Sequence, residues 1–464
     1  MRIKRLIAAA AACATLVAVP AFAAPAHSTS VKALHSAAGL HVVSVKQVNP
    51  RLIAVVVTTK SLPRPANIYI LLPPGYNPQS HRRYPVFYLL HGTSGTASDW
   101  TLKGNAQRVI GDRQLITVMP DIALDDGGGG WCTDWPDGTQ KWETFHINQL
   151  IPWVDTNLRT IATRSQRAIA GLSQGGFCSM SYAARHPDLF ATALAYSGAP
   201  DIYYDTRDRI GGMAVINATE VGLDQQPPDT FFGDPVTDGV NWAAHDPATL
   251  AENLRWTRMA MYWGNGQPGP YDTSPSSYGG GSIEFLVWNS NNDFRARLNA
   301  LHIPAYFDSY GAGTHAWPYW TRDVAQSIDT IMFDFAHPAP TPTAFTYTSG
   351  DDAYAIYGWS VAMHRAAREF STLSTSGALR FLLSGSGSAT VVTPATFTPG
   401  HRYAVRISGD ATGTRVVRVT AGRDHKLHLT VPLGPANAYQ QETPPAAIAG
   451  TAVYTTDVTI TDQS

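Results

Sequence analysis

The chain has 464 residues and a formal net charge of −1, with 15% charged and 44% hydrophobic residues. At roughly 100–200 residues per domain, this length predicts two or three folded units, and the composition excludes a largely disordered chain. The sequence contains no Lys/Arg-rich block or basic stripe, which argues against a nucleic-acid partner.

The N-terminus has the pattern of a cleaved export signal. A positively charged start, Met1–Arg5, precedes an apolar run, Leu6–Val19, and the small-residue motif Ala21–Ala23. A membrane span needs about 20 apolar residues, so we expect a signal peptide over residues 1–24 and a secreted protein with no stable membrane span. Export would leave Cys132 and Cys178 in an oxidising compartment, as one disulfide or as two free buried thiols.

Short β-branched runs alternate with longer amphipathic stretches from Leu52 onward. This pattern predicts an α/β fold with a doubly wound, mostly parallel sheet. The predicted strands are Leu52–Thr58, Asn67–Leu72, Tyr84–Leu90, Leu115–Met119, Arg167–Leu172, Ala191–Ser197, Thr257–Trp263 and Ala305–Tyr310. The predicted helices are Thr144–Leu158, Gln174–Arg185, Ile283–Leu301 and Trp317–Phe335. Two stretches without a clean period, residues 198–255 and 264–281, are predicted excursions over the active-site face.

The composition changes after Phe335. A Pro/Thr-rich linker over residues 337–344 precedes alternating runs separated by Gly, Ser and Asp turns. These runs predict a small all-β, sandwich-like C-terminal domain over residues 345–464, after a catalytic domain over residues 25–336.

The motif Gly171–Gly175 contains a candidate nucleophile, Ser173. A strand precedes it and a helix follows it, which is the strand-to-helix turn that exposes the serine in the α/β-hydrolase fold. The alternative is a glycine turn with a capping serine. We therefore expect an α/β-hydrolase fold with Ser173 as its nucleophile.

A serine hydroxyl needs a base and an acid that orients the base. The fold places the base after the last strand, where His315 lies; His302 falls in a helix-to-strand connection and His337 in the linker. The acid should follow the strand Thr257–Trp263 and precede His315. Spacing alone leaves four candidates, which are Asp272, Glu284, Asp293 and Asp308.

Two backbone amides should stabilise the oxyanion that forms during catalysis. One is expected from Gln174, the residue after the nucleophile, and the other from Thr93 in the loop after the strand Tyr84–Leu90. His91, at the start of that loop, is interpreted as structural rather than as a base.

Several motifs occur together in one order along about residues 50–335. They are Leu72–Tyr76, Tyr84–Gly92, Asp134–Trp135, Lys141–Phe145, Gly171–Gly176, Gly264–Gly266 and Gly313–His315 with Trp317, Tyr319 and Trp320. In these motifs the chain resembles the esterase D family, and within it the secreted mycolyltransferases of the antigen 85 type from actinobacteria.

The resemblance implies a Ser-Glu-His triad of Ser173, Glu284 and His315. The family's glutamate precedes Val, Asn and Phe at helical spacings, and Val287, Asn291 and Phe294 reproduce these spacings after Glu284. A competing alignment register would place Val287 at the position of the acid. Asp272 is the alternative acid if Glu284 is not the one. Ser94 and Trp317 are candidate substrate-binding residues. The mycolyltransferases carry Asp and Arg where this chain has His91 and Ser94, which argues against trehalose as acceptor.

The sequence therefore predicts a secreted serine esterase or acyltransferase that forms an acyl-enzyme and acts on an ester, lipid or glycolipid substrate. One alternative is a mycolyl or diacylglycerol-type acyltransferase of the cell envelope. Another is a non-catalytic protein that binds cell-wall glycan through the C-terminal domain, where Tyr354, Tyr357 and Trp359 would stack on sugars unless they fill the core.

We expect neither a metal nor another cofactor. Aspartates cluster in a Gly-rich segment at Asp121, Asp125, Asp126, Asp134 and Asp137. Their spacing matches no EF-hand, and a solvated loop explains them better than a calcium site.

Overall fold

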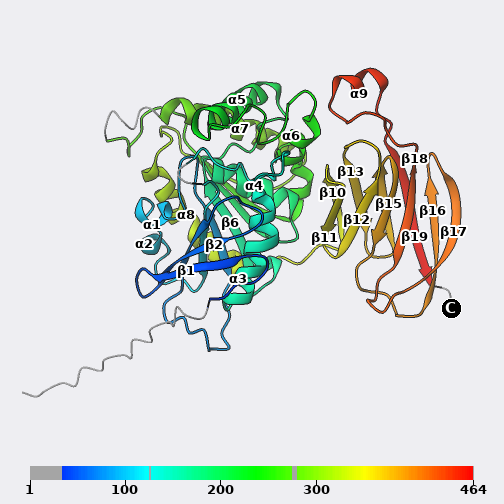
Figure 1. Cartoon of the computed structure of the whole chain (residues 1–464), viewed down its shortest axis with the longest axis horizontal. Helices are drawn as coiled ribbons and strands as arrows, with labels where there is room; N and C mark the ends of the chain where they lie inside the picture. Colours follow the sequence, from blue (N-terminus) through cyan, green and yellow to red (C-terminus); the bar gives the residue numbers. More distant parts are fainter. Residues whose placement is uncertain (1–33, 125–126, 274–279, 463–464) are drawn as a thin grey trace, which may run out of the picture.

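The computed structural model describes residues 34–124, 127–273 and 280–462, which form two regions (Figure 1). The first, called the α/β region, covers residues 34–336, and the second, called the β-region, covers residues 344–462. The expected signal peptide lies outside the described residues. Within the described part of the chain, no helix has the length and apolarity needed to cross a bilayer.

A nine-stranded sheet organises the α/β region. Its strands are β1 (His41–Gln47), β2 (Leu52–Thr58), β3 (Ala66–Leu71), β4 (Val86–Leu90), β5 (Ile116–Pro120), β6 (Arg167–Leu172), β7 (Thr192–Tyr196), β8 (Arg258–Trp263) and β9 (Tyr306–Ser309). The order is β1-β2-β3-β5-β4-β6-β7-β8-β9, antiparallel from β1 to β5 and parallel from β5 to β9. Every predicted strand is present to within two residues at each end, and β1 was not predicted.

Helices cover both faces of this sheet, and each face has its own apolar core. They are α1 (Asp99–Leu102), α2 (Ala106–Ile110), a π-helix η2 (Thr144–Leu150), α3 (Ile151–Asn157), a 3₁₀ turn η3 (Arg164–Gln166), α4 (Gln174–Arg185), α7 (Gly281–Ala300) and α8 (Trp317–Ala336). The core with α3 and α4 is larger than the one with α2 and α8. The predicted helix Thr144–Leu158 is a π-helix that continues as α3, because Pro152 lacks the N–H of a regular turn and is tolerated only at the start of α3.

The stretch between β7 and β8, called the insertion (residues 198–256), is largely helical. It contains α5 (Thr206–Asn217), a π-helix η4 (Ala218–Leu223), α6 (Gly239–His245) and a 3₁₀ helix η5 (Ala251–Trp256). Sequence reasoning predicted none of these helices, since α5 has almost no apolar face and buries only Asp208 and Ile216. The insertion lies above the carboxyl ends of the parallel strands (Figure 1).

Two antiparallel sheets form the β-region. The strands are β10 (Ala344–Ser349), β11 (Ala353–Ile356), β12 (Trp359–His364), β13 (Ser371–Ser376), β14 (Arg380–Gly385), β15 (Gly387–Val392), β16 (Arg402–Gly409), β17 (Gly413–Thr420), β18 (His428–Gly434) and β19 (Tyr454–Asp462), with a short helix α9 (Pro444–Ala449). The sheet orders are β10-β13-β14-β19-β16-β17 and β11-β12-β15-β18. One apolar cluster lies between them, as in a sandwich.

The aromatic residues considered for sugar binding are not free surface rings. Trp359 and Tyr354 are buried in the core of the β-region, at 2% and 9% exposure. Tyr357 is partly buried against the α/β region, where its hydroxyl donates to the Pro187 carbonyl and its ring packs on Arg164. Core and interface packing therefore account for all three.

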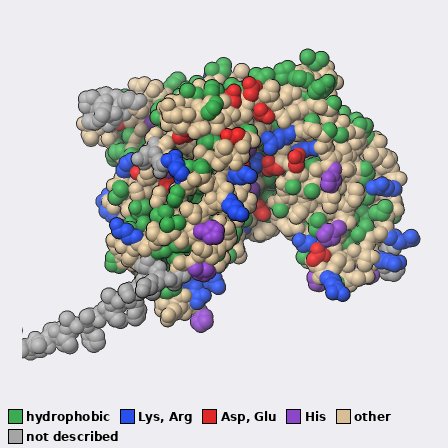
Figure 2. Space-filling view, viewed as in Figure 1, with side chains coloured by type: hydrophobic (Ala, Val, Ile, Leu, Met, Phe, Trp, Pro, Cys, Tyr) green, Lys and Arg blue, Asp and Glu red, His purple; other side chains and the backbone are tan. Residues whose placement is uncertain are grey.

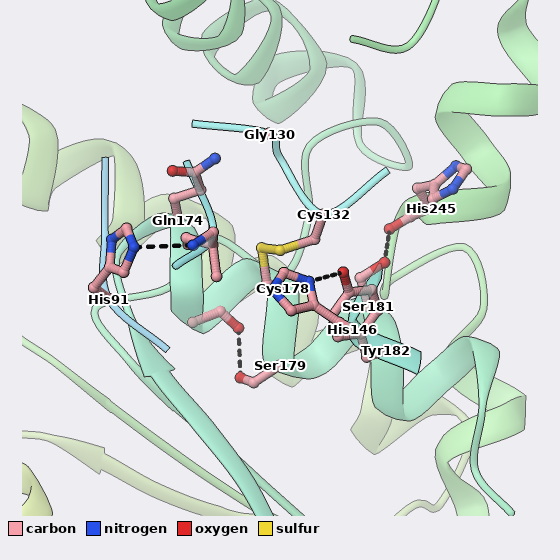
Figure 3. The surroundings of a disulfide bond; sticks show 12 residues. His91, Gly130, Cys132, His146, Gln174, Cys178, Ser179, Ser181, Tyr182 and His245 are labelled. Carbon is pink, nitrogen blue, oxygen red and sulfur yellow. Dashed lines mark hydrogen bonds between the residues drawn. A yellow bond between two sulfur atoms is a disulfide. The ribbon is translucent and has the colours of Figure 1, made fainter. Parts of the chain in front are cut away.

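A disulfide joins Cys132 to Cys178, with their Cα atoms 5.6 Å apart (Figure 3). Cys178 lies on α4, whose first residue follows Ser173, and Cys132 lies in the loop before η2. Of the two alternatives left open by the sequence, the structure has the disulfide. It ties a loop beside the candidate nucleophile to the helix that starts there.

Candidate active site

Ser173 occupies a sharp turn between β6 and α4. Its φ of +52° is unfavourable for a residue with a side chain, and neighbouring glycines make the turn possible. A Cβ on Gly171 would lie 2.3 Å from the Gly175 carbonyl oxygen, and one on Gly175 would lie 2.1 Å from the His91 carbonyl oxygen. The motif therefore forces the serine hydroxyl out of the turn.

His315 lies within hydrogen-bonding distance of the serine. It belongs to the loop between β9 and α8, and its Nε2 is 2.7 Å from the Ser173 Oγ. Its Nδ1 is 2.7 Å from Glu284 Oε2, and its ring packs edge-on against Trp320. The structure thus brings together the predicted serine, histidine and glutamate, which come from three distant segments of the chain.

Glu284 is fully buried in the first turn of α7. Its second carboxylate oxygen, Oε1, accepts hydrogen bonds from the Ser197 hydroxyl at 2.9 Å and the Gly264 amide at 2.7 Å. Both oxygens are therefore engaged, and the carboxylate is held in one orientation. Ser197 was missed by sequence reasoning; its position directly after a buried strand is the only sequence signal that could have identified it.

The other three acid candidates have other partners. Asp272 accepts hydrogen bonds from the hydroxyls of Thr314 and Tyr319, so it holds the residue before His315 rather than its ring. Asp293 pairs with Arg207, and Asp308 pairs with Arg322. Val287, the alternative of the competing register, lines a cavity beside Ser173.

The predicted oxyanion amides come from two separate segments next to the serine. Gln174 follows Ser173 in α4, and Thr93 lines the cleft in front of Ser173. Neither amide has a hydrogen-bond partner among the described residues, whereas the Ser94 amide donates to the Gly127 carbonyl at 3.1 Å. Two free donors next to a nucleophile can stabilise a developing oxyanion.

Hydrogen bonds of nearby side chains hold the two segments that carry these amides. Thr93 Oγ1 lies 3.2 Å from the Gln174 side-chain amide, which in its best-satisfied orientation also accepts from the Trp131 amide at 2.8 Å. His91 is buried, and its Nε2 accepts from the Ile122 amide at 3.0 Å. Burial lowers the His91 pKa, so this ring is a neutral structural element of the loop.

A small cavity and a large cleft meet at Ser173. The small cavity, of about 90 Å³, is mainly apolar and includes Trp131, Phe177, Ile202 and Leu286 in its wall. The large cleft, of about 910 Å³, includes His315 and both predicted substrate-binding residues, Ser94 and Trp317. Residues of the insertion, such as Val215, line both spaces, so this excursion covers the serine.

The described aspartates of the Gly-rich segment do not converge on one point. Asp121 accepts from the backbone amides of Asn67 and Ala97, while Asp134 and Asp137 accept from nearby threonines. Asp125 and Asp126 lie outside the described residues. Elsewhere in the described chain, Asp205, Asp208 and Asp293 come close enough to share a cation, and Arg207 pairs with two of them.

Comparisons with known proteins agree on one family. Residues 59–330 match the Esterase family model, described as "Putative esterase". Esterase Rv1288 of Mycobacterium tuberculosis is 32% identical over 273 residues, which cover 57% of this chain and 56% of that protein. The diacylglycerol acyltransferase/mycolyltransferase Ag85B of Mycolicibacterium smegmatis is 29% identical over 55% of this chain and 77% of its own length.

Among solved structures, MPT51 of Mycobacterium tuberculosis superposes with a TM-score of 0.49 at 22% identity, covering 63% of this chain and 99% of that one. The match to Esterase Rv1288 spans little more than half of that protein's length. The β-region lies beyond the residues that match the family model. The strand order of the nine-stranded sheet, the helices on both of its faces and the strand-to-helix turn at Ser173 are those of the α/β-hydrolase fold.

Proposed function

Since this chain belongs to the esterase family, we propose that it is a serine esterase or acyltransferase that forms an acyl-enzyme at Ser173. The observation that carries this proposal is the line of contacts from Ser173 through His315 to Glu284, each 2.7 Å long. The charge on Glu284 fixes the imidazole so that Nε2, the atom facing Ser173, is the acceptor.

In the first half-reaction, the Ser173 Oγ attacks the ester carbonyl carbon while His315 Nε2 takes the hydroxyl proton. The carbonyl oxygen becomes an oxyanion, which the amides of Thr93 and Gln174 stabilise. When the tetrahedral intermediate collapses, the bond to the alcohol breaks and His315 returns the proton to the leaving oxygen. The acyl group remains on Ser173.

In the second half-reaction, water or an alcohol gives its proton to His315 and attacks the acyl carbon. The bond from that carbon to the Ser173 Oγ then breaks, and His315 returns the proton to the serine oxygen. Water releases a carboxylic acid, and an alcohol yields a new ester. Mycolyl or diacylglycerol transfer, which the name of the 29% identical relative suggests, is the second candidate. His91 and Ser94 stand where the mycolyltransferases carry Asp and Arg, so trehalose is not the expected acceptor.

Intact-mass analysis after mixing with p-nitrophenyl esters tests the proposal. The wild-type chain should gain one acyl mass, and Ser173→Ala should gain none and lose turnover by at least about 10⁴-fold. Full activity of Ser173→Ala would overturn it. Added sugar or glycerol acceptors separate transfer from hydrolysis, because only transfer produces a new ester.

We also propose that the protein is exported. The disulfide between Cys132 and Cys178 supports this, since such bonds persist in oxidising compartments. Cell fractionation with an antibody tests it, and recovery of the intact chain only in the cytoplasm would contradict it.

A further inference from the structure

The two spaces that meet at Ser173 differ about tenfold in volume, roughly 90 Å³ against 910 Å³. We propose that they divide the substrate unequally: the small cavity takes the acyl group, the large cleft takes the alcohol, and the enzyme therefore prefers a short acyl group on a bulky alcohol. This inference rests on the proposed acyl-enzyme chemistry and names its substrate class.

Proton transfer decides which part of the ester occupies which space. The leaving oxygen must receive its proton from His315 Nε2, so the alcohol has to lie on the side of His315. The walls of the large cleft include His315 and Trp317. Ser173 also lines the small cavity, together with Gln174 and Phe177, whereas His315 is not among its lining residues. The acyl chain is therefore directed into the small cavity.

The small cavity exposes mainly apolar surface, although Asp201, Arg207 and Asp208 also line it, and part of its wall is tied to the rest of the fold. Trp131 packs on Phe177 with ring centroids 5.5 Å apart, and the disulfide at Cys132 ties the chain next to Trp131 to α4. On the opposite side, α5 approaches so closely that a Cβ on Gly212 would lie 2.9 Å from Ile202. A wall tied in this way cannot expand easily around a long chain.

The large cleft suits a larger group that combines apolar and polar parts. Its volume lies within the roughly 300–1,000 Å³ range of small-molecule sites. Trp317 and Trp320 offer aromatic surface, while Thr93, Ser94, Asp99 and Lys103 offer polar groups. Aromatic faces beside hydrogen-bonding groups favour a hydroxyl-bearing alcohol over a plain alkyl one.

Two matched ester series test this division. In the first, p-nitrophenyl esters keep the leaving group constant while the acyl chain grows from acetyl to palmitoyl. We expect kcat/KM to peak at short chains and to fall at least about 100-fold by palmitoyl, as misfit methylenes accumulate. In the second, butyryl esters of methanol and of a disaccharide keep the acyl group constant, and the disaccharide ester should be the better substrate. A maximum at palmitoyl would overturn the inference.

A matched pair of glycine substitutions locates the effect. Gly211 lines the small cavity, where an added Cβ would lie 3.4 Å from Leu286, whereas a Cβ on Gly222 would meet nothing within 4 Å. Gly211→Leu should shorten the preferred acyl chain, and Gly222→Leu should keep the wild-type profile. Leu286→Ala should lengthen it, which keeps the inference testable if Gly211→Leu misfolds. An unchanged profile in both cavity variants would contradict it.

The two proposals fail in different ways. If no ester acylates Ser173, the proposed function is wrong. If Ser173 is acylated but long chains react fastest, or if the Gly211 and Leu286 variants shift only the preference for the alcohol, the chemistry stands and the assignment of the two spaces is wrong.

Discussion

Buried polar groups serve different purposes in the α/β region and the β-region. In the α/β region, the buried Ser197 hydroxyl donates to buried Glu284, whose other carboxylate oxygen faces His315. In the β-region, buried Glu369 instead joins loops, accepting from the Ser386 amide and the Asn437 side chain. The first arrangement belongs to the proposed catalytic site, and the second joins loops of the sandwich.

The two regions meet at the far end of the helix that begins after the nucleophile. Arg185, the last residue of α4, bonds Glu143 at 2.9 Å and Asp351 of the β-region at 3.0 Å. Its carbonyl accepts from the Tyr347 hydroxyl at 2.5 Å. Figure 2 shows positive and negative side chains gathered where the regions meet. The β-region is therefore docked on the α/β region through these contacts and is not connected by the linker alone.

The largest expected effect lies in the catalytic network. Glu284→Gln keeps the size of the side chain but removes the charge and places an amide where an acceptor faces His315 Nδ1. We expect kcat to fall about 10⁴-fold with p-nitrophenyl butyrate, because the imidazole adopts the wrong tautomer. Asp272→Asn is the control, since Asp272 contacts Thr314 instead, and its loss should be far smaller. Equal losses would show that the acid was assigned wrongly.

Removing the disulfide should lower the free energy of unfolding of the α/β region. Cys132 and Cys178 are 46 residues apart, and closing a loop of that length stabilises a fold by about 4 kcal/mol in the chain-entropy description. The double variant with Ala at both positions should unfold at lower denaturant concentration by about that free energy. A midpoint equal to that of the wild type would mean that the bond adds no stability.

Breaking the contact between the regions should affect stability but not catalysis. Asp351→Asn leaves Arg185 and Glu143 in place, and we expect a loss of about 2 kcal/mol, less than for a fully buried pair because the Asp351 side chain is 31% exposed. Thermal unfolding and kcat, measured on the same preparation, check this prediction. A large fall in kcat without a change in stability would show instead that the β-region tunes the active site.

The stability that the contact between Asp351 and Arg185 contributes should depend on pH. Burial raises the pKa of Asp351, but the charge of Arg185 outweighs it and holds that pKa below its usual range. Such a group stabilises the fold above its unfolded pKa of about 4 and loses that contribution as the pH falls through the lower folded value. Acid unfolding of Asp351→Asn should therefore begin from a lower stability and fall less steeply than that of the wild type.

The sequence predicted Ser173 as the nucleophile from local geometry, because glycines at 171 and 175 are required for the turn that holds this serine. The order of elements along the chain predicted His315 as the base, and the structure places its ring next to Ser173. Glu284 could not be chosen by spacing, since all four acid candidates follow β8, and the resemblance to the mycolyltransferases made the choice. Only the packing of α7 against β8 shows which carboxylate faces the imidazole.

What the sequence could not predict depends on contacts between distant segments. The helix α5 has no apolar period because it covers a cavity instead of a core, so the sequence pattern predicted an excursion there and no helix. The docking of the β-region rests on Arg185 and Asp351, which are 166 positions apart and look like ordinary surface charges in the sequence. Charge and polarity alone do not reveal such pairs.

The last prediction concerns the pH dependence of stability in the insertion, and its effect should be the smallest. The insertion lies over the candidate active site and contains carboxyl groups whose charged form is destabilised by burial and by neighbouring carboxylates. Burial first, and then the charge of Asp293, raise the pKa of Asp208 to about 7. Asp205 also faces this carboxyl, and Arg207 opposes the shift. A group whose folded pKa is raised stabilises the fold fully below its unfolded pKa of about 4 and loses that contribution as the pH rises toward 7.

Melting temperatures measured between pH 4 and pH 8 should therefore fall less in Asp208→Asn than in the wild type, by a few degrees at most. The melting temperature of Asp208→Asn should still fall somewhat over this range, because burial also raises the pKa of Asp201 to about 8 and that of Asp246 to about 6. Asp112→Asn removes the same charge from a side chain that is 94% exposed, and it should leave the pH profile unchanged. If the two variants show the same pH profile, the raised pKa of Asp208 does not cause the fall in stability. The loss of one negative charge would then explain both results.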